Sequence, residues 1–486
     1  MSKPGVVVAL DQGTSSTKAV AVDETGAIIA SHVVPVAQHV PQPGWVEQDP
    51  EELLVSLVTA AERLVVDLPG PVVSVGLSNQ RESALVWETR TGKPLGPVLG
   101  WQDRRTRDHA RYLETLAGPR IRELSGLPVD PMFSALKFAR LLDEVDPDRS
   151  QARNGDITVG TLDAWLVQRL TGERRIELGN ASRTQLLNVR TGGWDDELMD
   201  IFGIPPASLP DPVPSDLPTA PVEHHGALDG LRIGAVLGDS HAALFAHGVR
   251  GEGRVKATYG TGSSVMGLSS GPVSPDTGLV ETIAWQHRGE IVRAFEGNIL
   301  STGATLQWLA GVLGCSTAEL AELAASTPDS GEVVLVPAFA GLGAPWWDET
   351  ARSVITGFGL GTRRQHLARA AFESIALQVE DVLERADAVS SERVHTVLAD
   401  GGPTRNDWLV QLQADLSDRQ VLRADATALS VTGAAHLAGL ASGLWDELAV
   451  QQLPRQRTTF SPSAVPGTPH VHRQWRAAVR RARAAV

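Results

Sequence analysis

Short apolar runs bounded by glycine, serine and asparagine alternate along this chain with longer segments of helical spacing. The first run, Val6–Leu10, ends in Asp11 and a turn of small residues. Further apolar runs at 18–23 and 27–31 complete a predicted three-strand meander. Residues 50–66 follow an Asp-Pro start signal and carry apolar residues at helical spacing. Strands that alternate with helices predict an α/β protein whose sheets are covered by helices.

The same alternation continues to the end of the chain. The pattern predicts further strands at 72–77, 156–159, 231–237, 333–336 and 394–399. It predicts helices from about Leu162 and at 242–247, 302–312, 365–389, 404–416 and 428–440. The segment 203–233 is rich in proline and glycine without a clear period, and we expect a surface loop there.

Two small-residue turns between strands are the first chemical signal. The turn at 12–17 follows Asp11, and Gly13 leaves room for backbone N–H groups and hydroxyls to approach an anion. A divalent cation on a polyphosphate would lie at Asp11. Residues 254–266, RVKATYGTGSSVM, repeat the order strand, turn, strand. One such turn is a weak signal, but the pair predicts two related halves that bind one nucleotide, with domains at 1–247 and 248–486.

Bulk properties exclude several classes of protein. A chain of 486 residues with a single cysteine, Cys315, has no intramolecular disulfide, which favours a reducing cytoplasm. A net charge of −14 argues against broad nucleic-acid binding. We find neither a signal peptide nor an apolar run near the ~20 residues that span a bilayer. The basic segment 472–486 predicts a helix that docks through Trp475 and Val479, with a membrane or acidic partner as the alternative.

Four side chains suit a polyhydroxylated ligand, and three of them follow predicted strands. Asp239 follows the strand at 231–237, where it could act as a general base or as the N-cap of the next helix. Arg81 and Glu82 follow the strand at 72–77 and could donate to and accept from neighbouring hydroxyls, or form a surface ion pair of little energetic weight. Trp101 could be an apolar wall or a packing residue.

A second strand end suits a flat ring. In VLADGGPTRNDW, residues 397–408, Gly401 and Gly402 would let a ring lie against the backbone while Asn406 bonds its edge. An ordinary strand-to-helix turn fits Gly-Gly-Pro equally well.

These motifs match a known family. They are VALDQGT (8–14), PGWVEQDP (43–50), NQRE (79–82), VWETRTGKP (86–94), DPMFS (130–134), GTLDAWL (160–166), NASRTQLLN (180–188), GD (238–239), TYGTG (258–262), PAFAGLGAPWWD (337–348), DGG (400–402) and TGAAHLAGL (432–440). Over nearly its whole length the chain resembles the FGGY carbohydrate kinases, and within them the glycerol kinase branch. The resemblance implies two actin-like, ribonuclease H-like α/β domains around a nucleotide cleft.

The resemblance also implies roles for individual residues, with ATP and Mg²⁺ as cofactors. Asp11 would orient the magnesium ion. The implied nucleotide contacts are Gln12, Thr14, Ser15, Ser16, Thr261, Gly262, Gly303, Gln307, Gly402 and Asn406. The implied acceptor pocket comprises Arg81, Glu82, Trp101, Met132, Asp239 and Ser240, with Asp239 as the base. The family further suggests a cytoplasmic homo-oligomer whose partners are small molecules.

Three pocket positions depart from the glycerol kinase pattern. Met132 stands where that branch has Tyr, Ser240 where it has Gln, and Ser264 where it has Phe. In the first FGGY signature region, Arg140 replaces the usual aromatic residue. The resemblance implies phosphorylation of a primary hydroxyl, with glycerol, converted to sn-glycerol 3-phosphate, as the first candidate acceptor. A four- or five-carbon polyol or ketose is the alternative acceptor, and an actin-like nucleotide-switch ATPase is the alternative from another class.

Overall fold

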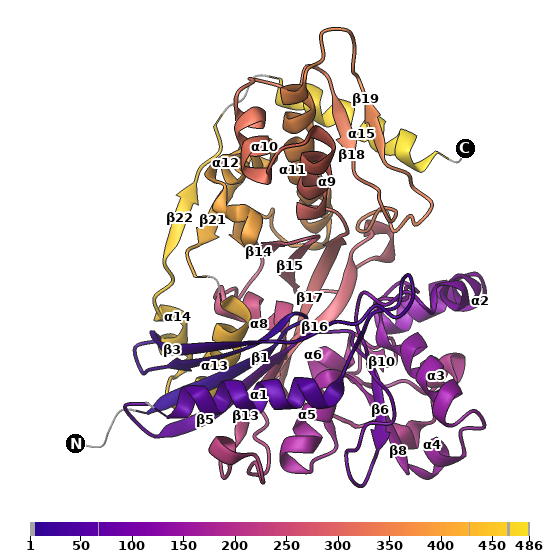
Figure 1. The fold of residues 1–486 in the computed structure, drawn as a ribbon, viewed down its shortest axis with the longest axis vertical. Helices are drawn as coiled ribbons and strands as arrows, with labels where there is room; N and C mark the ends of the chain where they lie inside the picture. Colours follow the sequence, from indigo (N-terminus) through magenta and orange to yellow (C-terminus); the bar gives the residue numbers. More distant parts are fainter. Residues whose placement is uncertain (1–4, 67, 427, 464–466, 485–486) are drawn as a thin grey trace. The chain divides into compact units, whose positions relative to one another are not determined.

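The computed structural model describes residues 5–66, 68–426, 428–463 and 467–484 (Figure 1). It divides into two compact units. Unit 1 comprises Met1–Gly248, Glu281–Ala294 and Ala428–Pro454. Unit 2 comprises Val249–Val280, Phe295–Thr427 and Arg455–Val486. The predicted limits 1–247 and 248–486 treat each domain as one continuous segment, whereas in the compact units 281–294 and 428–454 group with unit 1.

Unit 1 is built on a five-stranded sheet with the order β13-β5-β1-β2-β3. Its strands are β1 (Val6–Gln12), β2 (Ser16–Val22), β3 (Ile28–Pro35), β5 (Val72–Asn79) and β13 (Ile233–Gly238). The meander β1-β2-β3 is antiparallel, as predicted, while β1, β5 and β13 run parallel. Parallel strands need crossover connections, and the chain supplies them as long helical segments.

Unit 2 contains β14 (Arg254–Tyr259), β15 (Ser263–Ser269), β20 (Thr396–Asp400), β21 (Gln420–Ala424) and β22 (Arg457–Phe460). They belong to a sheet with the order β16-β17-β15-β14-β20-β21-β22. The chain passes from one unit to the other at the start of β16 (Val280–His287) and within β17 (Glu290–Ile299).

The two sheets share one topology. In each, an antiparallel hairpin is followed along the sheet by two further strands parallel to the first hairpin strand: β5 and β13 beside β1, and β20 and β21 beside β14. The predicted α/β class and the repetition of the hairpin in two related halves are confirmed.

The remaining strands pair in short two-stranded sheets. They are β4 (Glu47–Gln48) with β7 (Val98–Leu99), β6 (Leu85–Glu88) with β8 (Ile157–Gly160), β9 (Arg175–Glu177) with β12 (Asp211–Val213), β10 (Leu187–Asn188) with β11 (Gly193–Trp194), and β18 (Val334–Val336) with β19 (Val354–Thr356).

The helices of unit 1 come from the chain before residue 248 and from the segment 428–454. They are α1 (Pro50–Val65), α2 (Arg107–Ser125), α3 (Ser134–Val145), α4 (Ser150–Asn154), α5 (Leu162–Thr171), α6 (Leu178–Ala181), α7 (Asp196–Phe202), α8 (Asp239–Ala246), α13 (Leu429–Ala441) and α14 (Glu447–Gln452). Helix α13 approaches its neighbours closely, because a Cβ at Gly433 would lie 1.8 Å from the carbonyl oxygen of Ala242. Only glycine permits this packing of α13 against α8.

Unit 2 contributes α9 (Gly303–Leu313), α10 (Thr317–Ala325), α11 (Arg364–Val389), α12 (Asp407–Ser417) and α15 (Thr468–Arg483), with 3₁₀ turns η3 (Pro275–Thr277) and η4 (Gly402–Arg405). The predicted helix at 404–416 is wrong at its start, since η4 precedes α12 there and the Asn406 side chain caps α12. In unit 1, the expected loop 203–233 holds η1 (Pro206–Ser208), β12 and η2 (Gly226–Leu228).

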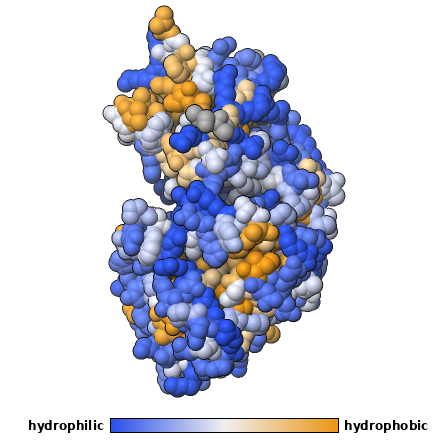
Figure 2. All heavy atoms as spheres, turned by 90° about the vertical axis from the view of Figure 1, so that its right-hand side faces the viewer, coloured by the Kyte–Doolittle hydropathy of each residue, from blue (hydrophilic) through white to orange (hydrophobic). Residues whose placement is uncertain are grey.

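Exposed apolar side chains are few on the face that Figure 2 displays. One group lies at the top of that view, the end at which Figure 1 draws the loop after β19, and another lies near its middle. Phe358 and Leu360 of this loop are 66 % and 110 % exposed. Among the residues that the structure describes, no helix has the length and apolar character needed to cross a membrane.

The basic C-terminal helix packs into the core of unit 2. Helix α15 buries Trp475, Ala478, Val479 and Ala482, and the indole N–H of Trp475 donates to Asp381 at 2.8 Å. Burial raises the pKa of Asp381 to about 7. The docking predicted for this segment is confirmed for residues 472–484, while Ala485 and Val486 lie outside the described residues.

We predict that Trp475→Ala destabilises unit 2 by ~3–5 kcal/mol, the usual result of deleting a buried aromatic side chain. The variant also removes the donor to Asp381. Arg480→Ala, on the exposed face of the same helix, is the matched control and should leave the melting temperature near that of the wild type. Thermal denaturation followed by circular dichroism measures both, and equal melting temperatures would contradict the docking.

Candidate functional site

Strand register in unit 1 gathers the predicted residues at one edge of the sheet. Gln12 aligns with Asn79 on one side, and Asn79 aligns with Gly238 on the other. Directly after these three positions come the β1–β2 turn, residues 80–82 of the NQRE segment, and helix α8. Because the carboxyl ends of parallel strands meet at one edge, segments far apart in the sequence become neighbours here.

The β1–β2 turn is closed by a hydrogen bond from Gly13 N–H to the carbonyl of Ser16, at 3.0 Å. Thr14 and Ser16 are half-buried and Ser15 is exposed, so all three can reach a ligand. Gln12 differs, because its side chain is fully buried and accepts from Thr17 Oγ1 at 2.9 Å. The predicted contact of Gln12 with a nucleotide would therefore use its backbone.

Trp101 is tied to the same turn. Its indole N–H donates to Thr14 Oγ1 at 3.2 Å, and the ring is 36 % exposed. The buried Gln48 amide donates to the carbonyl of Thr14 at 3.0 Å and accepts from Gln80 at 2.7 Å. A partly exposed indole beside the turn fits the predicted apolar wall better than a core packing role, which would bury the ring.

Asp11 lies at the end of β1 with one oxygen, Oδ1, that is buried and has no hydrogen-bond partner among the described residues. Burial, together with the negative charge of Asp239, raises the pKa of Asp11 to about 6. The two carboxylates are therefore close enough to interact, and a cation between or beside them would relieve the cost of both charges.

Arg81 and Asp239 form an ion pair at the same edge. Arg81 Nε lies 3.3 Å from Asp239 Oδ1, and Arg81 Nη1 lies 3.4 Å from His241 Nε2. The Arg81 side chain is 6 % exposed, but that of Asp239 is 39 % exposed. Asp239 is thus oriented by a buried guanidinium and still open to a ligand. Helix α8 begins at Asp239 with Gly238 as its N-cap, so the alternative reading of Asp239 as the cap is wrong.

Glu82 occupies a strained position beside this pair. Its φ of 58° is in the left-handed region, which costs a non-glycine residue about 1–3 kcal/mol. Arg183 Nε donates to Glu82 Oε1 at 2.6 Å, and Arg81 Nε lies 3.8 Å from the same oxygen. The side chain is 7 % exposed. Such strain persists only where surrounding contacts fix it, and this occurs most often at functional sites.

Met132 and Ser240 complete the predicted pocket residues of unit 1. Met132 is 5 % exposed, and its N–H donates to Asp130 at 2.8 Å. Ser240 is half-buried in the first turn of α8, with its N–H 2.6 Å from Asp239 Oδ1. The structure therefore gathers Asp11, Arg81, Glu82 and Asp239 around one sheet edge.

Unit 2 carries the second turn. Gly260 N–H donates to the carbonyl of Gly262 at 2.7 Å, and Gly303 N–H at the start of α9 donates to the carbonyl of Gly260 at 2.9 Å. A Cβ at Gly303 would lie 2.6 Å from that oxygen, so the turn and the helix start fit closely only with glycine. Thr261 at the tip and Gln307 on α9 are exposed, as ligand contacts must be.

The DGG segment adjoins this turn within unit 2. Gly401 has φ +99°, and a Cβ there would lie 1.9 Å from the carbonyl oxygen of Tyr259. Gly402 is exposed with nothing within 4 Å of its Cβ position. Asn406 Oδ1 accepts from Leu409 N–H at 3.2 Å as the cap of α12. Ser264 on β15 donates to Glu296 at 2.7 Å, a polar contact where glycerol kinases have an aromatic side chain.

Two buried cations were missed by the sequence reasoning. Lys137 on α3 and Arg183 after α6 are fully buried against Glu82. Both lie in or just beside segments that carried the family resemblance, DPMFS and NASRTQLLN, and this position was the available signal. In a helix, however, a lysine among apolar residues is ordinarily assigned to the solvent face.

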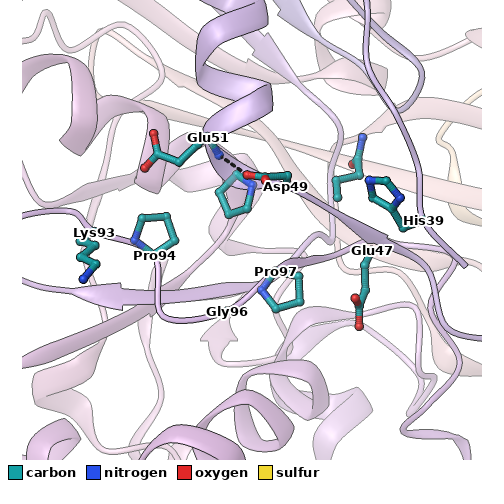
Figure 3. Close-up of a pocket in the computed structure, with 10 residues that line it drawn as sticks. His39, Glu47, Asp49, Glu51, Lys93, Pro94, Gly96 and Pro97 are labelled. Carbon is teal, nitrogen blue, oxygen red and sulfur yellow. Dashed lines mark hydrogen bonds between the residues drawn. The ribbon is translucent and has the colours of Figure 1, made fainter. Parts of the chain in front are cut away.

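A groove of about 500 Å³ in unit 1 is lined in part by Gln48, which also donates to the Thr14 carbonyl (Figure 3). Its lining includes His39, Glu47, Asp49, Glu51 and Lys93, and none of the predicted site residues. Asp49 there accepts from Glu51 N–H at 2.8 Å as the N-cap of α1. A structural role accounts for this carboxylate, and we assign no ligand to the groove.

The geometry agrees with comparisons to known proteins. Residues 6–246 match the N-terminal domain model of the FGGY family of carbohydrate kinases, and residues 255–442 match the C-terminal domain model. An apulose kinase from Pectobacterium atrosepticum is 41 % identical, with 98 % of each chain covered. A glycerol kinase from Aromatoleum aromaticum is 42 % identical over the same share of both chains.

A solved structure shares the fold. The crystal structure of Plasmodium falciparum glycerol kinase with ADP superposes with a TM-score of 0.93 over 100 % of both chains at 27 % identity. The α/β architecture of two units, each with an antiparallel hairpin beside parallel strands, is therefore a known kinase fold. Both family models together cover most of the chain, which thus belongs to the FGGY family of carbohydrate kinases, phosphotransferases that act on an alcohol group.

Proposed function

We propose that this kinase transfers the γ-phosphoryl group of ATP to a primary hydroxyl of a small polyol or ketose. The observation that carries the proposal is the group of Arg81, Glu82 and Asp239 at one sheet edge, next to the β1–β2 turn. A partly exposed carboxylate oriented by a buried guanidinium is suited to accept a hydroxyl proton. Arg81 and Glu82 would donate to and accept from neighbouring hydroxyls of the acceptor.

Nucleotide binding is proposed for both turns. The contacts would come from Gln12–Ser16 in unit 1 and from Thr261, Gly262, Gly303, Gln307, Gly402 and Asn406 in unit 2. Backbone N–H groups at such turns stabilise the negative charge of phosphate oxygens. The buried, unpartnered Oδ1 of Asp11 fits a magnesium ion, which when bound would neutralise charge on the β- and γ-phosphates.

Phosphoryl transfer asks for little covalent chemistry from the protein. Positioning of the acceptor hydroxyl and stabilisation of charge supply most of the rate. Asp239 would take the proton of the attacking hydroxyl, and Arg81 would keep its carboxylate ionised and aligned. An actin-like ATPase switch, the rival from another class, has no use for these acceptor residues together. Homo-oligomerisation, which the family suggests, stays a prediction.

Glycerol is the first candidate acceptor, because the NQRE tetrapeptide is characteristic of the glycerol kinase branch and relatives of that name are about 40 % identical. A five-carbon ketose is the second candidate. It is favoured by Met132 and by the polar Ser264–Glu296 contact, which replace two aromatic side chains. The similarity to an apulose kinase points in the same direction.

We predict that Asp239→Ala lowers kcat by ~10²–10⁴-fold, the usual contribution of a general base. ATP should still bind, which calorimetry can measure, because the turns are untouched. Asp200→Ala, an exposed carboxylate on α7, is the matched control and should keep wild-type turnover. Turnover of Asp239→Ala near the wild-type value would refute its role as the base.

Acceptor choice is measured by ADP release from Mg-ATP with glycerol, erythritol, ribitol, xylulose, ribulose, apulose, dihydroxyacetone and no acceptor. We expect the highest kcat/KM with glycerol, and preference for a ketose would replace the first candidate by the second.

Met132→Tyr restores the side chain of the glycerol kinase branch and tests the same choice within the pocket. It should raise kcat/KM for glycerol relative to the five-carbon ketoses, because an aromatic wall suits a three-carbon chain. The ratio of kcat/KM for glycerol and ribulose in wild type and variant measures this effect. An unchanged ratio would show that Met132 does not determine acceptor size.

A further inference from the structure

A fully buried lysine lies behind the proposed acceptor residues of unit 1. Lys137 on α3 is 0 % exposed, and its Nζ donates to three backbone carbonyls. The distances are 2.7 Å to Glu82, 2.7 Å to Met132 and 3.0 Å to Gly100. An ammonium group has three N–H donors, so three acceptors satisfy it completely.

The three carbonyls belong to three separate segments. Glu82 follows β5, Gly100 follows β7, and Met132 precedes α3. Glu82 and Met132 are themselves proposed acceptor residues, and Gly100 directly precedes Trp101. One side chain therefore joins the backbones that carry three of the proposed acceptor contacts.

Lys137 and Arg183 fix different parts of Glu82. Arg183 holds the carboxylate, whereas Lys137 holds the carbonyl of the residue whose φ is 58°. The guanidinium of Arg183 in turn lies over the ring of Phe133, 5.1 Å from its centre. Loss of Lys137 would free the backbone of Glu82 without removing the partner of its carboxylate.

We propose that Lys137 is a positioning residue of the acceptor site, whose ammonium group holds the segments of Glu82, Trp101 and Met132 in their binding geometry. This inference rests on the proposed function, since it assumes that these three residues contact the acceptor. Lys137 itself has no exposed surface, so it would act through these three segments and not by contact with the acceptor.

Protonation of Lys137 decides how many of the three bonds exist. Burial lowers the pKa of Lys137 to about 7, against the opposing effect of the Glu82 and Asp103 carboxylates. The other charged groups that face it are Arg104, which lowers this pKa, and Asp130, which raises it. At a pH below this pKa, the ammonium group donates three hydrogen bonds. Above it the neutral amine donates only two, so one carbonyl loses its partner and the geometry of the site loosens.

The wild-type enzyme provides the first test. We expect the KM for the acceptor to rise several-fold between pH 6 and pH 9 while the KM for ATP changes little. A KM for the acceptor that stays flat, or that changes in parallel with the KM for ATP, would overturn the proposal.

Lys137→Met removes the donors and nearly keeps the volume. Its KM for the acceptor should be about 10-fold or more above that of the wild type, because small misplacements of binding groups are costly. The acceptor KM of the variant should no longer change between pH 6 and pH 9. Its KM for ATP should stay near the wild-type value. Arg140→Met, on the same helix and 44 % exposed at the side chain, removes an equal charge and should leave both KM values unchanged.

The outcomes separate the inference from the proposed function. A wild-type protein that phosphorylates no acceptor refutes the proposed function. An active wild type together with a folded Lys137→Met variant of unchanged acceptor KM refutes the inference alone. If Lys137→Met does not fold, the wild-type pH profile decides.

Discussion

The parallel pairing of β1, β5 and β13 is the constraint on which the site of unit 1 depends. Its register sets Gln12, Asn79 and Gly238 side by side, so the residues after each strand must share one edge of the sheet. Arg81 lies 70 positions after Asp11 and Asp239 lies 158 positions after Arg81, and this pairing brings the three together. Glycine at Gly433 and Gly76 allows α13 to pack closely enough to hold the strands and α8 in place.

A second requirement is the burial of charge. Arg81, Glu82, Lys137 and Arg183 are nearly inaccessible to water, and such charges are tolerated only when each is paired or hydrogen-bonded. Here one residue takes part in several of these contacts: the Glu82 carboxylate accepts a hydrogen bond from Arg183, and the Glu82 carbonyl accepts one from Lys137. A network of this kind resists movement, since displacing one member leaves another charge buried without its partner. The network thereby fixes the positions of Arg81 and Glu82, two of the proposed acceptor residues.

The sequence predicted the strand ends, but it did not predict the buried residues that hold the site in place, Lys137 and Arg183. The predicted apolar runs before Asp11, Arg81 and Asp239 end within two residues of the ends of β1, β5 and β13, and the paired hairpins predicted the repeated topology. Lys137 gave no such signal, because its partners are backbone carbonyls of three distant segments and no local pattern encodes them. Asn406 illustrates another limit: its side chain suits a ring edge and a helix cap equally, and the cap is what the structure shows.

The central claim is that the γ-phosphoryl group goes to an alcohol and not to water. Phosphorus NMR of the full-length protein with Mg-ATP and acceptor measures this directly, because a phosphomonoester and inorganic phosphate have distinct resonances. We expect one phosphomonoester for each ADP formed, and little ADP without acceptor. Equal release of ADP and inorganic phosphate, whether or not an acceptor is present, would contradict the account and identify the chain as an ATPase.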